Sequence, residues 1–301
     1  MMSVLEKVKE LRDVTGAGMQ ECKNALKEND NNIEKSIEYL RKKGVLKAAK
    51  KSSRDAAEGL IIIGEDKNSI NLTEINSETD FVAKNEEFIS FCKKISEISI
   101  KAKNFDDLNN TKINGAAVKD LLVGLVSKIG ENIKLRRFRK ILKENYKSAF
   151  YVHNKVNNHM GKIISVLKYE SKNDESEQFA SNICMHIAAM SPMALNEDNL
   201  EVDFINKEKK IIEEQVDKNG KKPEILEKIV KGKLNKVISE NTLLNQKWVI
   251  DQELTVNQAI ENFNKKYSDN FKILDYIKFK VGEGIEVKKI DFSEEVKSLT
   301  K

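Results

Sequence analysis

The chain begins with three short runs in which apolar side chains recur three or four positions apart, the spacing of one helical face. The apolar positions of these runs are Val4, Leu5, Val8, Leu11, Met19, Cys22, Ala25, Leu26, Ile33, Ile37 and Leu40. Asn31 and Glu34 fit a capping box before the third run, and Gly44 fits its end. The pattern predicts a three-helix domain over residues 1–54, with the basic stretch 41–54 as a linker.

The pattern changes near residue 57, where short β-branched runs replace the helical spacing. The segments "GLIIIG" and "SINLTEIN", separated by the polar turn "EDKN", are typical of two paired strands. A helix is expected over residues 78–102, and residues 118–129 carry a clear amphipathic stripe. The turn "GEN" then leads into a further strand, "IKLRRF". Residues 55–146 are therefore predicted to form the first subdomain of a core.

The second half of the chain repeats the order strand, strand, helix. The strands are "SAFYVH" and "KIISVLKY", and the helix passes through Phe179, Ile183 and Ile187. We expect a second subdomain made of residues 147–200 and 241–282. Each subdomain is predicted to be an antiparallel sheet with helices on one face, which makes the fold class α+β.

Residues 201–240 interrupt the second subdomain with two helical stripes joined by "DKNGKKP", and Pro223 suits a first helical position. The pattern predicts an antiparallel coiled-coil hairpin with a thin seam, which needs packing from the core or from a second copy of itself. Thr255 with Gln258 fits a capping box for the helix that follows. A short C-terminal helical module is expected over residues 283–301.

Charge is mixed along most of the chain. The 53 basic and 48 acidic residues give a net charge of +5, and Lys alternates with Glu, as on a solvated surface. The acid-poor run 41–54 is more typical of a linker or a helix end than of a phosphate site. Three dispersed cysteines indicate buried thiols in a reducing compartment. With no apolar leader and no membrane-length apolar window, a cytoplasmic protein without a membrane partner is expected.

The sequence offers no positive case for covalent or metal catalysis. The three histidines, His153, His159 and His186, lack metal-ligand spacing, and neither a GxSxG nor a Walker A motif occurs. "VGEGIE" lacks the third glycine of a dinucleotide-binding loop. Histidines beside apolar residues, as His153 and His186 are, usually have a structural role. We expect no catalytic residue, no metal site and no cofactor.

The segment "EINSETDFVAK", residues 74–84, supports two interpretations. Ser77 and Asp80 fit a capping box for the following helix, and Phe81 lies seven positions before Phe88 and eleven before Cys92. This periodicity favours a buried Phe81. However, the first turn of a helix after a strand is an edge of the fold, where an aromatic ring can project for a partner to bury.

Six segments together resemble a known family. They are "LRDVTGAGMQECKNAL", "EINSETDFVAK", "KIGENIKLRRF", "ICMHIAAMSP", "LLNQKWVID" and "VGEGIE", in that order along the chain. They are similar to the signatures of the bacterial elongation factor Ts family, the guanine-nucleotide exchange factors of elongation factor Tu. The likeness covers essentially the whole chain, and its first two motifs are long and specific.

The resemblance implies a ubiquitin-associated-like N-terminal domain, a two-subdomain core, the coiled-coil hairpin and a C-terminal module. It also implies that the segment of Thr79, Asp80, Phe81 and Val82 reaches into the nucleotide-binding domain of elongation factor Tu. There the phenylalanine is received between partner helices, and the Mg²⁺ ion that helps hold GDP is dislodged. Such an exchange factor performs no covalent chemistry.

The resemblance implies further contacts with elongation factor Tu. They fall on Met19, Lys23, Ile129, Gly130, His186, Val249 and Ile250. The chain departs from the family pattern at Ser165, at Trp248 and in residues 154–160, all in the second half. A heterodimer and a 2:2 assembly remain open. Three alternatives also remain open: a protein that binds RNA through residues 41–54, an enzyme that uses His186 and Cys184, and a scaffold protein in which Phe81 is a core residue.

Overall fold

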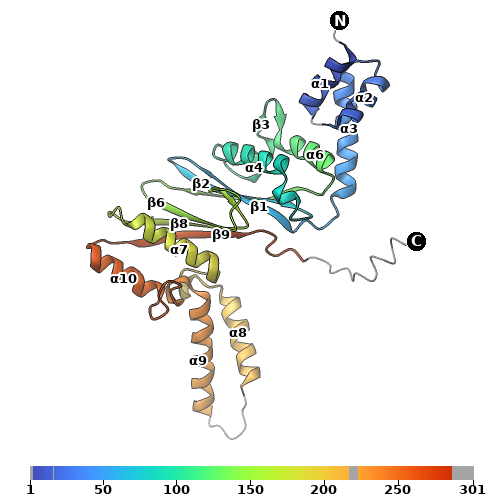
Figure 1. Ribbon diagram of the computed structural model, residues 1–301. Helices are drawn as coiled ribbons and strands as arrows, with labels where there is room; N and C mark the ends of the chain where they lie inside the picture. The colour runs from blue at the N-terminus through green and yellow to red at the C-terminus, as the bar shows by residue number, and fades with distance from the viewer. Residues whose placement is uncertain (1–2, 16, 217–222, 287–301) are drawn as a thin grey trace. The chain divides into compact units, whose positions relative to one another are not determined.

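The computed structural model describes residues 3–15, 17–216 and 223–286 (Figure 1). It confirms the α+β class, because helices accompany antiparallel strand pairs. The chain divides into two compact units. The first contains the chain up to Leu142, residues 154–162 and the segment from Phe279 onward, and the second contains Lys143–His153 and Ile163–Lys278.

Three helices open the first unit: α1 (Val4–Thr15), α2 (Met19–Glu28) and α3 (Ile33–Lys51). Their small shared core contains the apolar residues Val8, Leu11, Cys22, Ala25, Leu26 and Leu40. The predicted capping box of Asn31 and Glu34 is wrong by one position. Asn32 is the N-cap, and its side chain accepts the backbone N–H of Lys35.

Helix α3 continues to Lys51 instead of ending at Gly44. At Gly44 it packs against α6 (Val118–Ile129), where a Cβ would lie in ordinary contact with Val123 (3.7 Å) and Ser127 (3.9 Å). Most of the basic stretch predicted as a linker is therefore helix. Within it, Lys47 pairs with Glu21.

A four-stranded sheet, in the order β5-β2-β1-β7, forms the centre of the first unit. Its strands are β1 (Glu58–Glu65), β2 (Ser69–Ser77), β5 (Lys134–Leu142) and β7 (Met160–Gly161). All paired neighbours run antiparallel, so the predicted strand pair "GLIIIG" and "SINLTEIN" is confirmed. Strand β2 lies between two others and is buried at every position.

Short elements and two longer helices complete the first unit. They are the 3₁₀ turn η1 (Val82–Lys84), α4 (Glu86–Ser99), α5 (Phe105–Asn110), β3 (Lys112–Ile113), β4 (Ala116–Ala117) and α6. Helix α4 lies against the sheet (Figure 1). Its buried Phe88, Phe91 and Ile95 join residues of α6 in one core.

The second unit contains a three-stranded sheet in the order β6-β8-β9. Its elements are β6 (Lys147–His153), β8 (Ile163–Glu170), α7 (Ser176–Met190), η2 (Glu197–Asn199), α8 (Val202–Gln215), α9 (Pro223–Asn241), η3 (Leu243–Asn245), α10 (Val256–Tyr267) and β9 (Lys272–Lys280). The Thr255–Gln258 capping box is confirmed, with both hydrogen bonds formed. Phe179 stacks on Phe263 at 4.5 Å between centroids, within an aromatic core.

Helices α8 and α9 lie side by side as a hairpin (Figure 1). Pro223 begins α9, as its position predicts. Most of the predicted loop, residues 217–222, lies outside the described residues, as does the predicted helix "DFSEEVKSL" at the end of the chain. Of the predicted C-terminal module, residues 283–286 are described and contain no helix.

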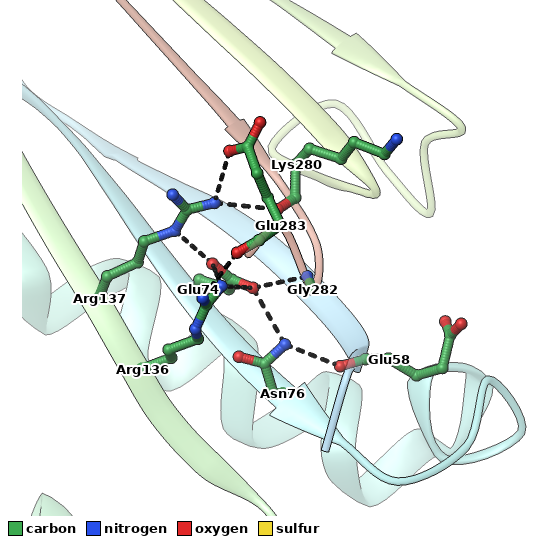
Figure 2. A network of polar contacts seen from close by, with 8 residues as sticks. All are labelled: Glu58, Glu74, Asn76, Arg136, Arg137, Lys280, Gly282 and Glu283. Carbon is green, nitrogen blue, oxygen red and sulfur yellow. Dashed lines mark hydrogen bonds and ion pairs between the residues drawn. The ribbon is translucent and has the colours of Figure 1, made fainter. Parts of the chain in front are cut away.

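A buried carboxylate, Glu74, fastens the end of the described chain to strands β2 and β5 (Figure 2). The Glu74 side chain is fully buried and pairs with Arg136, at 3.2 Å, and with Arg137. The backbone N–H of Gly282 donates to Glu74 Oε1 at 2.8 Å. Arg137 also donates to the Lys280 carbonyl at 2.9 Å, so the carboxylate and its arginines hold the 280–283 segment.

Replacing Glu74 with Ala should lower the free energy of unfolding by about 3 kcal/mol, because two partly buried guanidinium groups and a peptide N–H lose their acceptor. Chemical denaturation of both proteins at pH 7 measures the difference. Glu38, whose pair with Lys42 is exposed, provides the control, and Glu38→Ala should leave stability unchanged. A Glu74→Ala protein as stable as the parent would show that the network contributes nothing to stability.

Candidate functional site

The segment between β2 and α4 contains the predicted site, and it is not the start of a long helix. The hydroxyl of Ser77 donates to the carbonyl of Thr79 at 2.9 Å, so the predicted capping box of Ser77 and Asp80 is wrong. Helix α4 begins only at Glu86. Its N-cap is Asn85, whose side chain accepts the backbone N–H groups of Glu87 and Phe88.

Phe81 projects from this segment. Its side chain is 78% exposed, whereas Val82 and Ala83, the next two residues, are buried in the core of the first unit. The periodicity that favours a buried Phe81 is wrong because η1 and the cap at Asn85 break the helix. Phe81 and Phe88 therefore do not lie on one helical face, and the burial of Val82 and Ala83 directs the ring outward.

A hollow of about 400 Å³ lies beside the exposed ring. Phe81, Val82 and Ile129 supply its apolar lining, and Lys128 and Glu87 form an ion pair among its polar lining residues. The structure thus brings together Phe81 and Ile129, two of the predicted contact residues, although they are far apart in the sequence. A ring next to an apolar hollow offers a partner both a projection and a recess.

Asp80 carries a negative charge next to the ring. Its carboxylate accepts from Lys84 Nζ at 2.9 Å, and the same ammonium group lies 5.9 Å from the Phe81 ring centroid. The hydrogen bond from Lys84 lowers the pKa of Asp80 below its ordinary value. Asp80 and Lys84 are both accessible to solvent, so this pair contributes little to stability.

The turn after α6 holds the same segment from the other side. Glu131 accepts the backbone N–H of Thr79 at 3.0 Å and the Thr79 hydroxyl at 2.7 Å. The backbone N–H of Asn132 donates to Glu78 Oε1 at 2.5 Å. Sequence reasoning missed Glu131 and Asn132, since "GEN" reads only as a turn. The short polar run after a helix-ending glycine was the one available signal.

Met19 and Lys23 lie exposed on α2, whose buried residues belong to the separate core of the three N-terminal helices. Gly130 ends α6 with a left-handed φ of 90°, and its carbonyl accepts a hydrogen bond from Lys51. The contact links the end of α3 to the turn that precedes Glu131.

The remaining predicted contacts lie in the second unit. His186 is fully buried, accepts the backbone N–H of Val249 at Nδ1 (3.3 Å), and therefore donates from Nε2 to Gln246 Oε1 (2.9 Å). Burial lowers the pKa of His186, which keeps the imidazole neutral. His186 thus supports the 246–250 segment from inside, whereas Ile250 is exposed.

The two departures in the second unit are both buried. Ser165 donates to the Cys184 carbonyl at 2.5 Å, and Trp248 packs against His186 with ring centroids 5.3 Å apart. Ser165 thus ties β8 to α7, and Trp248 belongs with His186 to the buried support of Val249 and Ile250.

The described residues contain no group of three or more side chains able to hold a metal ion. The three cysteines are unpaired and buried, as predicted, and burial raises the thiol pKa of both Cys92 and Cys184. Among the helices of the described ranges, none has the length and apolar character needed to span a bilayer.

The sequence profile of the family described as "Elongation factor TS" matches residues 78–283, more than half of the chain. Proteins named elongation factor Ts from Clostridium botulinum and from a Nitratiruptor species are each 42% identical to it. In both cases the alignment covers 96% of this chain and 96% of the relative. The chain belongs to the elongation factor Ts family.

A relative with the same name from Rickettsia prowazekii is 39% identical, over 97% of this chain and 96% of its own length. The resemblance seen in the sequence motifs is therefore confirmed, and with it a role as a translation elongation factor. The matched profile begins at Glu78, so it includes the whole projecting segment.

Substituting Met for Lys84 should raise the pKa of Asp80 toward its ordinary value of about 3.9, because the charged hydrogen bond is lost. Carboxyl carbon NMR during an acid titration measures the pKa of Asp80 in the parent and in the variant. Asp66, whose pKa is lowered mainly by the backbone N–H groups of Asn68 and Ser69, is the internal control and should not shift. An Asp80 pKa unaffected by the substitution would mean that Lys84 does not hold the carboxylate.

The buried His186 should make unfolding of the second unit pH-dependent. The unfolded chain binds a proton at the ordinary pKa of about 6.5 whereas the folded chain binds it only at lower pH, so stability falls as pH drops below that value. Urea unfolding at pH 7.5 and 5.5 measures the loss. His186→Gln should flatten the dependence of stability on pH, whereas His153→Gln should not. If stability changes equally with pH in both variants, His186 is not the group responsible.

Proposed function

We propose that the chain promotes GDP release from elongation factor Tu, which then reloads with GTP. Its Asp80-Phe81 segment inserts into the nucleotide-binding domain, and the disturbance dislodges the Mg²⁺ ion that helps hold GDP. The observation that carries this proposal is the exposed Phe81 ring directly before the buried Val82 and Ala83, within a motif of the elongation factor Ts family.

An exposed aromatic ring is costly unless a partner buries it. Full burial of a phenylalanine side chain is worth roughly 1.5–3 kcal/mol, and such rings are common energetic centres of interfaces. Val82 and Ala83 are packed in the core directly beside Phe81, so the ring is presented on a rigid base. A rigid projection loses little conformational entropy on binding, which leaves more of its burial energy to disturb the partner.

The proposed exchange requires no acid, base or nucleophile in this chain. A factor that binds the nucleotide-free partner more tightly than the GDP-bound one must weaken GDP binding by the same coupling free energy. The chain is therefore proposed to be a nucleotide exchange factor without covalent chemistry or a cofactor. Thr79, Asp80, Phe81 and Val82 form the proposed partner-binding segment; because Val82 is buried in the core, its part is to hold Phe81 outward.

The other contacts with elongation factor Tu are proposals of the same kind. They fall on Met19, Lys23, Ile129, Gly130, His186, Val249 and Ile250. Because His186 is buried, its part is to hold Val249 and Ile250, which then meet the partner directly. We further propose a cytoplasmic location, with a heterodimer or a 2:2 assembly as the working states and no direct nucleic-acid or membrane partner.

We also propose the domain organisation that the family resemblance implies. It consists of a ubiquitin-associated-like domain (1–54), two core subdomains (55–146, and 147–200 with 241–282), a coiled-coil hairpin (201–240) and a C-terminal module (283–301). In the alternative function, RNA binding by residues 41–54, the lysines of this stretch would have to be available. Two of them, Lys47 and Lys51, already bind Glu21 and the Gly130 carbonyl, and no observation favours this alternative.

Release of a fluorescent GDP from elongation factor Tu tests the proposed function. The parent chain should accelerate release, and Phe81→Ala should remove about 2 kcal/mol or more of the acceleration, roughly thirtyfold in rate, because the inserted ring is lost. Since Phe81 is exposed, the melting temperature should stay unchanged.

The control is Leu142→Ala, which truncates another exposed apolar side chain of the first unit and should exchange normally. No acceleration by the parent chain would overturn the proposed function. Normal exchange by Phe81→Ala would keep the function and remove Phe81 from it.

A further inference from the structure

Glu131 lies outside the projecting segment but holds it by both carboxylate oxygens. Oε2 accepts the backbone N–H of Thr79 at 3.0 Å, and Oε1 accepts the Thr79 hydroxyl at 2.7 Å. A third hydrogen bond has its donor on the turn, from the backbone N–H of Asn132 to Glu78 Oε1 at 2.5 Å. Two adjacent residues of the projecting segment are thus joined to two adjacent residues of the turn after α6.

We propose that Glu131 is a positioning residue that fixes the direction in which Asp80 and Phe81 project. The inference rests on the proposed function, because the direction matters only if a partner receives the ring. On the C-terminal side, Val82 and Ala83 are already fixed by burial in the core. On the N-terminal side, Thr79 is the last anchored residue before Asp80, and both of its donors are bound to Glu131.

The turn that carries Glu131 is itself fixed at three points. Gly130 ends α6 in a left-handed conformation, and its carbonyl accepts from Lys51. Asn132 is buried, and its side-chain amide donates to the Arg54 carbonyl at 2.6 Å. Glu131 therefore connects the projecting segment to a turn that is held by α6 and by the end of α3.

The two hydrogen bonds between Glu131 and Thr79, here called the clamp, suit a positioning role. A carboxylate that accepts two hydrogen bonds from one residue defines both the position and the orientation of that residue. Without the carboxylate, the chain from Glu78 to Phe81 would keep fewer fixed points and would populate several directions of the ring. A partner would then have to order the segment on binding, which weakens insertion.

The first test measures the mobility of position 81 in the free protein, without any partner. A spin label on Phe81→Cys reports it, because Cys22, Cys92 and Cys184 are fully buried and leave the new thiol as the accessible target. Adding Glu131→Ala should make the label more mobile and therefore narrow its electron paramagnetic resonance lines. Glu38→Ala, which removes a carboxylate from an exposed pair, should leave the lines unchanged. Unchanged lines in the Glu131→Ala protein would overturn the proposal.

Conservative variants separate positioning from general destabilisation. Thr79→Ser keeps both donors and should keep the broad lines, whereas Thr79→Val loses the hydroxyl and should narrow them. Glu131→Gln retains one acceptor oxygen and should fall between the parent and Glu131→Ala. If Glu131→Ala melts early, these three variants decide the matter, and equal spectra for Thr79→Ser and Thr79→Val would count against the clamp.

The second test is release of fluorescent GDP from elongation factor Tu, with the Phe81 ring intact. Glu131→Ala should slow the accelerated release at least about tenfold, the scale of losing a hydrogen bond to a charged group. Thermal melting checks that both proteins are folded at the assay temperature. If the parent accelerates release and Glu131→Ala matches it, the positioning role fails and the proposed function stands. If the parent has no effect, the proposed function fails, and the spectra still show whether Glu131 restrains the segment.

Discussion

The burial of Val82 and Ala83 is the constraint on which the presentation of Phe81 depends. Strand β2 is buried along its whole length and ends at Ser77, and α4 cannot begin before its cap at Asn85. The chain must cross between these two fixed elements in a few residues while it packs two apolar side chains into the core. A single 3₁₀ turn does this, and the residue before it, Phe81, is left outside.

The surrounding structure makes that short crossing rigid. The turn after α6 binds Thr79 and Glu78, and Asn85 caps α4 directly after the 3₁₀ turn. Three residues before the end of β2, Glu74 is held by two arginines of β5 and by the Gly282 N–H. An exchange factor acts by binding two states of its partner with different affinities, so its own site must be stiff enough to impose a shape. In the proposed exchange role, this network supplies that stiffness.

Elements that are determined by their own local sequence pattern could be predicted from the sequence. Strands β1 and β2, the amphipathic α6 and the Thr255 capping box follow from periodicity and cap chemistry. Gly44 was misread because a glycine inside a helix and a glycine after one look alike in sequence. In the structure Gly44 lies inside α3, which continues to Lys51 and packs against α6. Phe81 was misread from periodicity because a 3₁₀ turn shifts the helical phase, and Glu131 was missed because its partner lies 52 residues earlier.

The most direct measurement is photo-crosslinking from position 81 with benzoylphenylalanine in place of Phe81, in the presence of elongation factor Tu. The account predicts a crosslink to the nucleotide-binding domain of elongation factor Tu, and excess GDP should lower its yield because GDP and the inserted ring oppose each other. The same photoreactive residue in place of the exposed Leu142 should give no such product. A complex that forms normally but yields no crosslink from position 81 would contradict the claim that the partner receives this ring.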